Sequence, residues 1–138
     1  MKILITGAKG FIGKNLIAEL KNRKYSDIFK YDIDTAPTLL DKYCKEADFV
    51  FHLAGVNRPK ENSEFMEGNF GFTSVLLDLL RKYRNTCPIM ISSSIQAELD
   101  NPYGKSKKAG EELLINYGKE TGAKVLIYRF PNVYGKLS

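Results

Sequence analysis

Residues 2–13, KILITGAKGFIG, join a short apolar run to three evenly spaced glycines. The apolar run predicts a buried strand, and the glycines predict a tight turn that leads into a helix. Beyond the turn, Ile12, Leu16 and Leu20 recur every four residues, which predicts an amphipathic helix packed against a sheet. A strand, a glycine-rich turn and a helix in this order are typical of a phosphate-binding βα unit.

Each glycine of this turn has a predicted task. Gly7 permits the turn, Gly10 lets a pyrophosphate approach the backbone, and Gly13 lets the helix pack closely on the strand. The spacing is Gly-x-x-Gly-x-x-Gly, which differs from the commoner Gly-x-Gly-x-x-Gly fingerprint. A glycine-rich turn that binds no ligand is therefore the alternative interpretation.

Strand-like and helix-like segments alternate along the rest of the chain. Further strands are predicted at 27–32, 48–53, 89–92 and 124–129, and further helices at 37–46, 64–83 and 102–117. The continuous apolar run at 125–128 is typical of parallel strands covered on both faces. The predicted fold is α/β: a Rossmann-type, doubly wound parallel sheet of about five strands with helices on both faces.

Composition narrows the possible functions. The 138 residues are 43% hydrophobic, enough for one core and one domain, residues 1–138. The net charge is +5, but the lysines are scattered, which favours an anionic small molecule over nucleic acid. Two cysteines and one histidine predict neither a metal site nor a disulfide framework. No long apolar stretch or signal peptide is seen, so we expect no membrane partner and a cytoplasmic location.

Residues 92–107, SSSIQAELDNPYGKSK, place serines upstream of a tyrosine and a lysine. Asn101 can cap a helix and Pro102 suits its first turn, so Tyr103 and Lys107 are expected on one helical face. An ammonium beside a phenol lowers the pKa of the phenol, which suits acid–base chemistry near neutral pH. The alternative is a polar helix with an ordinary surface tyrosine and lysine.

Four motifs occur in order along nearly the whole chain: 6–13 TGAKGFIG, 48–55 DFVFHLAG, Ser94 with Tyr103-x-x-x-Lys107, and 129–135 RFPNVYG. With these motifs the chain resembles the extended short-chain dehydrogenases/reductases, the NAD-dependent epimerase/dehydratase family that acts on nucleotide-linked sugars. The resemblance implies an oxidoreductase with a nicotinamide dinucleotide cofactor and a nucleotide-diphosphate sugar as substrate.

Shorter strings, HLAGVNRP at 52–59 and SSSIQA at 92–97, are similar to the CapF group of capsular-polysaccharide reductases. This narrower resemblance implies reduction of a nucleotide-linked 4-keto sugar in capsular or surface polysaccharide synthesis. Family members continue beyond the position of Ser138, so we expect residues 1–138 to be an NAD(P)-binding domain truncated before the substrate-binding region. The chain alone is then expected to bind cofactor without turnover, and the full-length form to be a homodimer.

The resemblance assigns three catalytic residues. Tyr103 is the general acid, which gives its proton to a carbonyl oxygen as hydride arrives from the nicotinamide. Lys107 lowers the pKa of Tyr103 and hydrogen-bonds the nicotinamide ribose. Ser94 hydrogen-bonds the reacting oxygen and polarises it, with a neighbouring serine as the alternative.

The predicted cofactor contacts come from the glycine turn, the strand ends and the catalytic helix: Gly7, Lys9, Gly10, Phe11, Ile12, Gly13, Asp32, Leu53, Ala54, Gly55, Ser92, Tyr103, Lys107 and Pro131. Ser94 and Asn132 are the predicted substrate contacts. Asp32 lies nineteen residues after Gly13, where a carboxylate binds a ribose 2′-hydroxyl and repels a 2′-phosphate, so NAD is predicted. Asp34 is the alternative acid, and Lys9 near a 2′-phosphate keeps NADP as the alternative cofactor.

Two expectations concern buried positions. His52 lies inside an apolar run and is predicted to be a core residue, not a catalyst. Phe65, Phe70 and Phe72 follow helical spacing and are also expected in the core.

Two other functions share these motifs. One is a nucleotide-sugar epimerase that keeps NAD tightly bound and recycles it. The other is a non-catalytic dinucleotide-binding module, although such proteins commonly lose the tyrosine and lysine. A dehydratase is disfavoured because Ile95 and Gln96 stand where dehydratases usually carry an Asp-Glu pair.

Overall fold

The computed structural model describes residues 1–32, 34–53, 70–94, 100 and 102–130, with only the backbone of Ser94, Pro102, Tyr103 and Phe130. The elements are β1 Ile3–Thr6, α1 Phe11–Asn22, β2 Ile28–Tyr31, α2 Pro37–Glu46, β3 Phe49–His52, α4 Phe72–Lys82, β4 Ile89–Ser94, α5 Pro102–Thr121 and β5 Val125–Phe130. The five strands form one parallel sheet in the order β2-β1-β3-β4-β5. The predicted α/β fold is confirmed.

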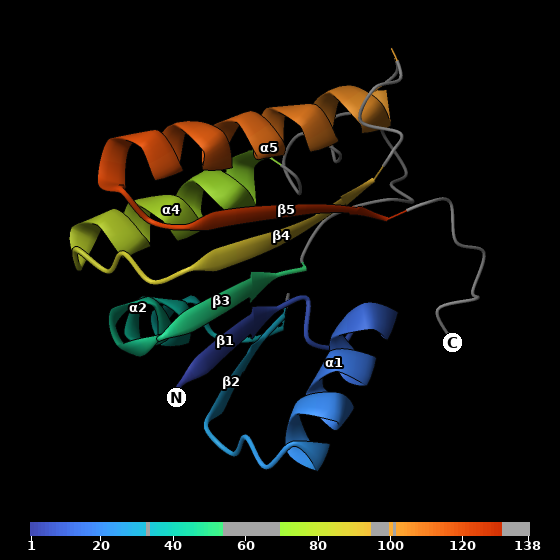
Figure 1. The fold of residues 1–138 in the computed structure, drawn as a ribbon, viewed down its shortest axis with the longest axis vertical. Helices are drawn as coiled ribbons and strands as arrows, with labels where there is room; N and C mark the ends of the chain where they lie inside the picture. The colour runs from blue at the N-terminus through green and yellow to red at the C-terminus, as the bar shows by residue number, and fades with distance from the viewer. Residues whose placement is uncertain (33, 54–69, 95–99, 101, 131–138) are drawn as a thin grey trace.

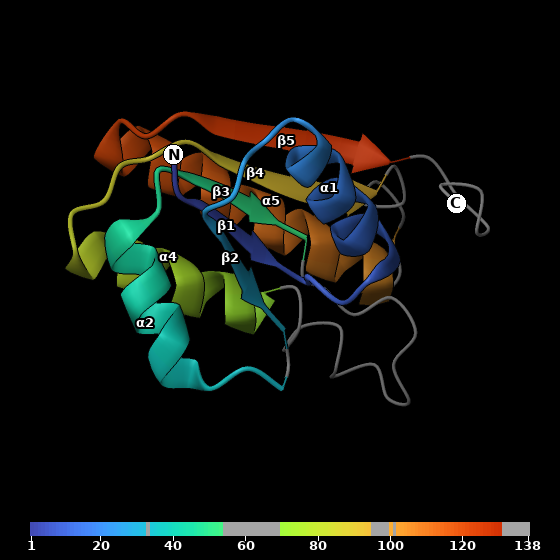
Figure 2. The same ribbon diagram turned by 90° about the horizontal axis from the view of Figure 1, so that it is seen from below.

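Helices cover both faces of the sheet, with α1 on one side and α2, α4 and α5 on the other (Figures 1 and 2). From β1 the chain first runs outward to β2 and then returns past β1 to β3. In such a doubly wound sheet, ligands bind at the carboxyl ends of the strands, in the crevice where the strand order reverses. The reversal between β1 and β3 therefore marks the place to look for a site.

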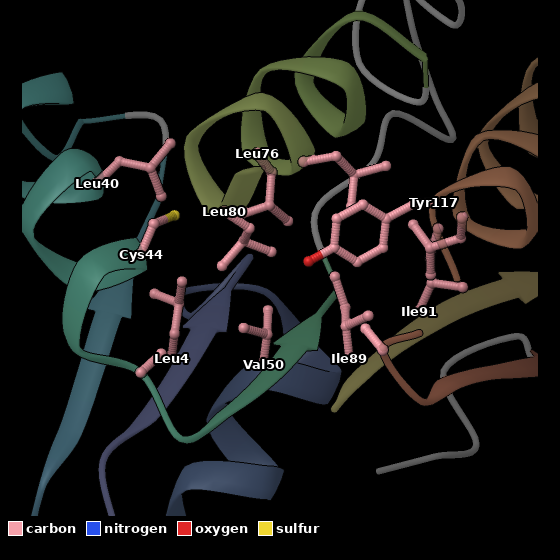
Figure 3. Packing of buried hydrophobic residues seen from close by; sticks show 13 residues of the cluster. Leu4, Leu40, Cys44, Val50, Leu76, Leu80, Ile89, Ile91 and Tyr117 are labelled. Carbon is pink, nitrogen blue, oxygen red and sulfur yellow. The ribbon is translucent and has the colours of Figure 1, made fainter. Parts of the chain in front are cut away.

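The larger core lies between the sheet and helices α2, α4 and α5 (Figure 3). Leu4, Val50 and Ile89 from three neighbouring strands lie beneath Leu80 of α4 and Tyr117 of α5, and each is fully buried. The Tyr117 hydroxyl donates a hydrogen bond of 3.1 Å to the carbonyl of Asn85. This bond satisfies the one polar atom of that side chain, so the ring can pack in an apolar layer.

A smaller core joins α1 to the other face of the sheet through Ile3, Ile5 and Ile17. Two glycines fix where α1 begins. Gly7 has a φ of 71°, a conformation that favours glycine. A Cβ on Gly13 would lie 2.3 Å from the carbonyl oxygen of Gly7, so only glycine lets α1 approach the turn this closely. The predicted tasks of Gly7 and Gly13 agree with this geometry.

The element boundaries differ from the sequence-based ones in informative ways. The strand predicted at 89–92 continues to Ser94, and the helix predicted at 102–117 continues to Thr121. In the helix predicted at 64–83, residues 64–69 lie outside the described residues. Phe72 packs on the larger core, but the expectation for Phe70 is wrong, because its side chain is 38% exposed. Residues 70–71 form a wider π-type turn before α4, which shifts the phase of the apolar stripe. Phe65 is not described.

The described helices include none with the length and hydropathy needed to cross a bilayer. Within the same residues, no group of three or more His, Cys, Asp or Glu side chains is arranged to hold a metal ion.

Candidate cofactor and catalytic site

The carboxyl ends of the strands bring several predicted site residues to one rim (Figure 1). Gly7 directly follows β1, Asp32 directly follows β2, and Leu53 directly follows β3. Ser92 and Ser94 lie among the last three residues of β4. Tyr103 and Lys107 lie in the first two turns of α5. Ala54, Gly55, Pro131 and Asn132 lie outside the described residues, so their predicted contacts stay predictions.

The glycine turn leads into an open helix N-terminus. Gly10 is the N-cap of α1, and no side chain makes a capping hydrogen bond there. The Gly10 amide donates to the Gly7 carbonyl at 3.0 Å, which closes the turn. Amides of the first helical turn, at Phe11 and Ile12, have no partner within the helix and suit an anion. Together with the close approach of Gly13, this turn fits the pyrophosphate of a dinucleotide.

The end of β2 is tied to the glycine turn. The backbone amide of Lys9 donates to Oδ2 of Asp32 at 2.7 Å, and the Ala8 amide donates to the Tyr31 carbonyl at 3.2 Å. On the other side, the Asp32 amide donates to Oγ1 of Thr35 at 2.9 Å. These contacts hold the Asp32 carboxylate beside the turn, the position from which an acid reaches a ribose 2′-hydroxyl in this fold.

Lys9 and Asp34 form an exposed ion pair next to Asp32. The hydrogen bond between them raises the pKa of Lys9 and lowers the pKa of Asp34. The positive charge of Lys9 is thus already paired with the Asp34 carboxylate. In the part of the chain that the structure describes, this edge of the site holds the carboxylates of Asp32 and Asp34 and the Lys9 ammonium.

His52 bridges three elements inside the protein. Its Nδ1 lies 2.7 Å from Oγ1 of Thr6 in β1, and its Nε2 lies 2.8 Å from Oγ1 of Thr73 in α4. The ring is fully buried. Burial, with a smaller effect from the charge of Lys107, lowers the pKa of His52 to about 3, so one ring nitrogen donates and the other accepts. The prediction that His52 is a core residue is confirmed.

On α5, Tyr103, Lys107 and Glu111 follow one another at intervals of four, which places them on one helical face. Lys107 is partly buried. Burial lowers the pKa of Lys107 to about 8, and the negative charge of Glu111 opposes that shift. The backbone of α5 thus places the position of Tyr103 one helical turn before a partly buried cation.

The serines at the end of β4 differ in their surroundings. The Ser93 hydroxyl is buried and, among the described side chains, has no hydrogen-bond partner. Because side chains alternate along a strand, Ser93 points to the same face as Ile91, which packs with α4 and α5. Ser92 is also buried but points to the opposite face. A buried hydroxyl without a partner one residue before Ser94 keeps the neighbouring-serine alternative open.

No sequence motif singled out the pairing of Glu111 with Arg129. Their ion pair joins α5 to β5 through two hydrogen bonds, from Nε to Oε2 at 2.8 Å and from Nη2 to Oε1 at 2.5 Å. Glu111 is a further four residues beyond Lys107, a spacing that could have identified it. Arg129 becomes its partner only when α5 packs on β5. Thr6 and Thr73, the partners of His52, carried no comparable signal.

Residues 3–138 match the family described as NAD dependent epimerase/dehydratase. All of this chain aligns, at 44% identity, with 37% of the UDP-2-acetamido-2,6-beta-L-arabino-hexul-4-ose reductase of Pseudomonas aeruginosa. The chain therefore spans little more than a third of that relative.

Solved structures agree with this match. The capsular polysaccharide assembling protein CapF from Staphylococcus aureus has a TM-score of 0.84 and 48% identity, over 98% of this chain and 37% of CapF. The UDP-glucuronic acid 4-epimerase from Bacillus cereus, solved with UDP-glucuronic acid and NAD, has a TM-score of 0.80 and 25% identity, over 98% of this chain and 58% of the epimerase. RMD from Pseudomonas aeruginosa, solved with NADPH, has a TM-score of 0.75 and 25% identity, over 96% of this chain and 55% of RMD.

Proposed function

The chain belongs to the NAD dependent epimerase/dehydratase family, and we propose that it is the cofactor-binding part of a reductase of nucleotide-linked 4-keto sugars in capsular or surface polysaccharide synthesis. One observation carries this proposal: the glycine turn and the Tyr103–Lys107 face of α5 meet the same rim of the sheet, with the pKa of Lys107 at about 8. The 44% identity to a reductase of a UDP-linked hexulose, over the whole chain, supports a sugar nucleotide as substrate.

The proposed reaction assigns one task to each group. The glycine turn and the first turn of α1 bind the pyrophosphate, and Asp32 binds the adenosine ribose. A bound nicotinamide dinucleotide supplies the hydride. The positive charge of Lys107 lowers the pKa of Tyr103, which donates its proton to the carbonyl oxygen of the sugar. The Ser94 hydroxyl polarises that carbonyl and fixes its position.

NAD is the cofactor that the edge of the site favours. Asp32 is fixed beside the turn by the Lys9 amide, and Asp34 holds the Lys9 ammonium. Among the described residues at this edge, a 2′-phosphate would therefore meet the two carboxylates of Asp32 and Asp34 and the Lys9 ammonium, which is already paired with Asp34. This electrostatic balance supports NAD over NADP, although a relative with each cofactor is known.

An epimerase with tightly bound NAD is the second candidate, because the NAD-bound epimerase from Bacillus cereus matches nearly the whole chain. The two enzymes differ in a simple observable. A reductase consumes reduced cofactor in proportion to product, whereas an epimerase returns its cofactor at the end of each cycle.

A homodimer also stays a proposal. The outer sides of α4 and α5 expose Val75 and Ile115, which are 51% and 42% accessible. These two helices pack against each other, and an exposed apolar side chain on each of them supports pairing through this pair of helices.

The test compares Tyr103→Phe with Tyr25→Phe in the protein, with any chain that follows residue 138 in its gene retained. Tyr103→Phe should lower reductase turnover about 10²–10⁴-fold, the usual contribution of a positioned acid. Its affinity for NADH, measured by calorimetric titration, should stay within about twofold of the unsubstituted protein, because the pyrophosphate and ribose sites are intact.

Tyr25→Phe is the matched control, since Tyr25 is 39% exposed in the segment between α1 and β2, away from the rim. It should change neither quantity. Undiminished turnover in Tyr103→Phe would remove Tyr103 from the mechanism, and tighter binding of NADPH than of NADH would overturn the argument from Asp32 and Asp34.

A further inference from the structure

Glu111 of α5 carries a carboxylate that is buried in the folded protein. Its accessible fraction is 4%, and it lies one helical turn after Lys107. Both of its oxygens accept hydrogen bonds from Arg129 near the end of β5. A two-point contact of this kind fixes the plane of the carboxylate as well as its distance from the guanidinium.

A second Arg–Glu pair on the same helix joins α5 to α4 while remaining exposed. Glu120 accepts hydrogen bonds from Arg81 of α4 at 2.9 and 3.2 Å, yet its side chain is 56% exposed. Burial of two charges costs free energy that an exposed pair avoids, and apolar side chains of similar size often serve stability equally well. The burial of Glu111 therefore calls for a reason other than anchoring the helix.

Lys107 supplies that reason. Among the described residues, Glu111 on the same helix is the charged group that raises the pKa of Lys107. The charge of Lys107 in turn acts on His52 of β3, and Arg129 of β5 binds the Glu111 carboxylate. His52 is neutral, so the carboxylate of Glu111 is the group that favours the charged form of Lys107 against the cost of burial. Arg129 partly cancels the field of that carboxylate.

We propose that the Glu111–Arg129 pair is a positioning device for the reductase site, which holds a carboxylate at a fixed place one turn behind Lys107 and so sets the fraction of that lysine that is charged. Neither residue is assigned contact with substrate or cofactor. The inference rests on the proposed function only in its last step, from the charge of Lys107 to the reactivity of Tyr103.

The experiment titrates the Lys107 side chain by ¹³C NMR in the protein, with its signal assigned by loss in Lys107→Arg. Glu111→Gln should lower the pKa of Lys107 by about one pH unit or more, because it removes an attractive charge and leaves Arg129 unopposed. Arg129→Met should raise it, because the carboxylate of Glu111 is then no longer partly cancelled. Two variants that break the same contact should thus move the titration in opposite directions.

Glu112→Gln is the matched control, because Glu112 is the next residue of α5 and is exposed. It should leave the Lys107 titration within about 0.2 pH units, as expected for a charge screened by water. A structural role alone would shift Glu111→Gln and Arg129→Met the same way, and that result, or an unchanged pKa of Lys107 in Glu111→Gln, would overturn the proposal.

If Glu111→Gln fails to fold, the double replacement Glu111→Leu with Arg129→Met keeps the volume without a buried charge. Lys107 should still titrate below its value in the unsubstituted protein, and an unchanged value would again refute the inference.

The titration needs no substrate, so it decides this inference even if no reductase activity is found. Where the protein does turn over, the pH profile of kcat/KM in Glu111→Gln should shift in the same direction as Lys107. If the pKa of Lys107 shifted but the pH profile of kcat/KM did not, the charge of Lys107 would not control the reactivity of Tyr103. That result would contradict the positioning role.

Discussion

The sheet face beneath α4 and α5 differs between its two ends. At the amino ends of the strands, Leu4 of β1 pairs with Val50 of β3, and both side chains are fully buried among apolar groups. Two residues further along the same strands, Thr6 pairs with His52, and both are again fully buried. The backbone pairing of β1 with β3 continues without change, but the paired side chains change from apolar to polar within two residues.

This contrast separates stability from function. Apolar side chains stabilise the fold by leaving water and need no specific partner. A buried polar group without a partner costs free energy, so the polar side chains at the carboxyl end need placed partners; Ser93 is an exception among the described side chains. His52 has Thr6 and Thr73, and Glu111 has Arg129. The apolar end should therefore carry most of the folding free energy, and the polar end should control pH response and charge.

The largest effect is expected from a change at the apolar end. Leu80→Ala removes a fully buried side chain of α4 and leaves a cavity against the sheet. The free energy of unfolding should fall by about 3 kcal/mol, within the usual range for buried leucine. Urea unfolding followed by circular dichroism measures it.

Leu39→Ala on α2 is the control, because Leu39 is 38% exposed. It should cost less than about 1 kcal/mol. Similar losses at both positions would contradict the assignment of stability to the buried apolar layer.

The same contrast explains what the sequence could predict. Helices and strands follow local periodicity, and parallel topology then brings the strand ends to one rim, so Gly7, Asp32 and Ser94 were predictable positions. The pairs at the polar end join residues far apart in the chain: His52 lies 46 residues from Thr6, and Arg129 lies 18 from Glu111. Which distant side chains meet depends on the register between β1 and β3 for Thr6 and His52, and on how α5 packs on β5 for Glu111 and Arg129. No local pattern encodes that packing.

The exposed Phe70 is a position where a local pattern predicted the wrong environment for a side chain. Its spacing from Phe72 suggested one continuous helical stripe, but a π-type turn at 70–71 changes the number of residues per turn. Periodicity extrapolated across such a turn assigns side chains to the wrong face.

The next largest effect is a pH dependence that His52 contributes at the polar end. The pKa of His52 is about 3 when folded, below the 6.5 of an unfolded histidine. The unfolded chain therefore binds a proton that the folded chain rejects, and the stability present above pH 6.5 is lost as pH falls toward 3. Between pH 7 and pH 5, the free energy of unfolding should fall by about 2 kcal/mol from this residue.

His52→Gln isolates that contribution, because the sequence contains a single histidine. Glutamine can still donate to one threonine and accept from the other, but it does not titrate. Urea unfolding at pH 7 and at pH 5 should show a fall in the unsubstituted protein that is about 2 kcal/mol larger than in the variant. An equal fall in both would mean that His52 is protonated as easily in the folded protein as in the unfolded chain.

The smallest effect is expected from the exposed ion pair between Arg81 and Glu120, which lies near the apolar end of the sheet but outside the core. Glu120→Gln breaks the exposed contact with Arg81, whose guanidinium keeps Asp78 at 3.0 Å and stacks 5.3 Å from the Tyr117 ring centre. The loss should be at most about 0.5 kcal/mol, and added salt should reduce it further. Glu111→Gln, the same change on the same helix, should cost about 3 kcal/mol, near the lower limit for a buried pair because Arg129 is still 31% exposed. Urea unfolding of the two variants side by side measures both values, and comparable losses would show that burial does not distinguish the two ends of α5.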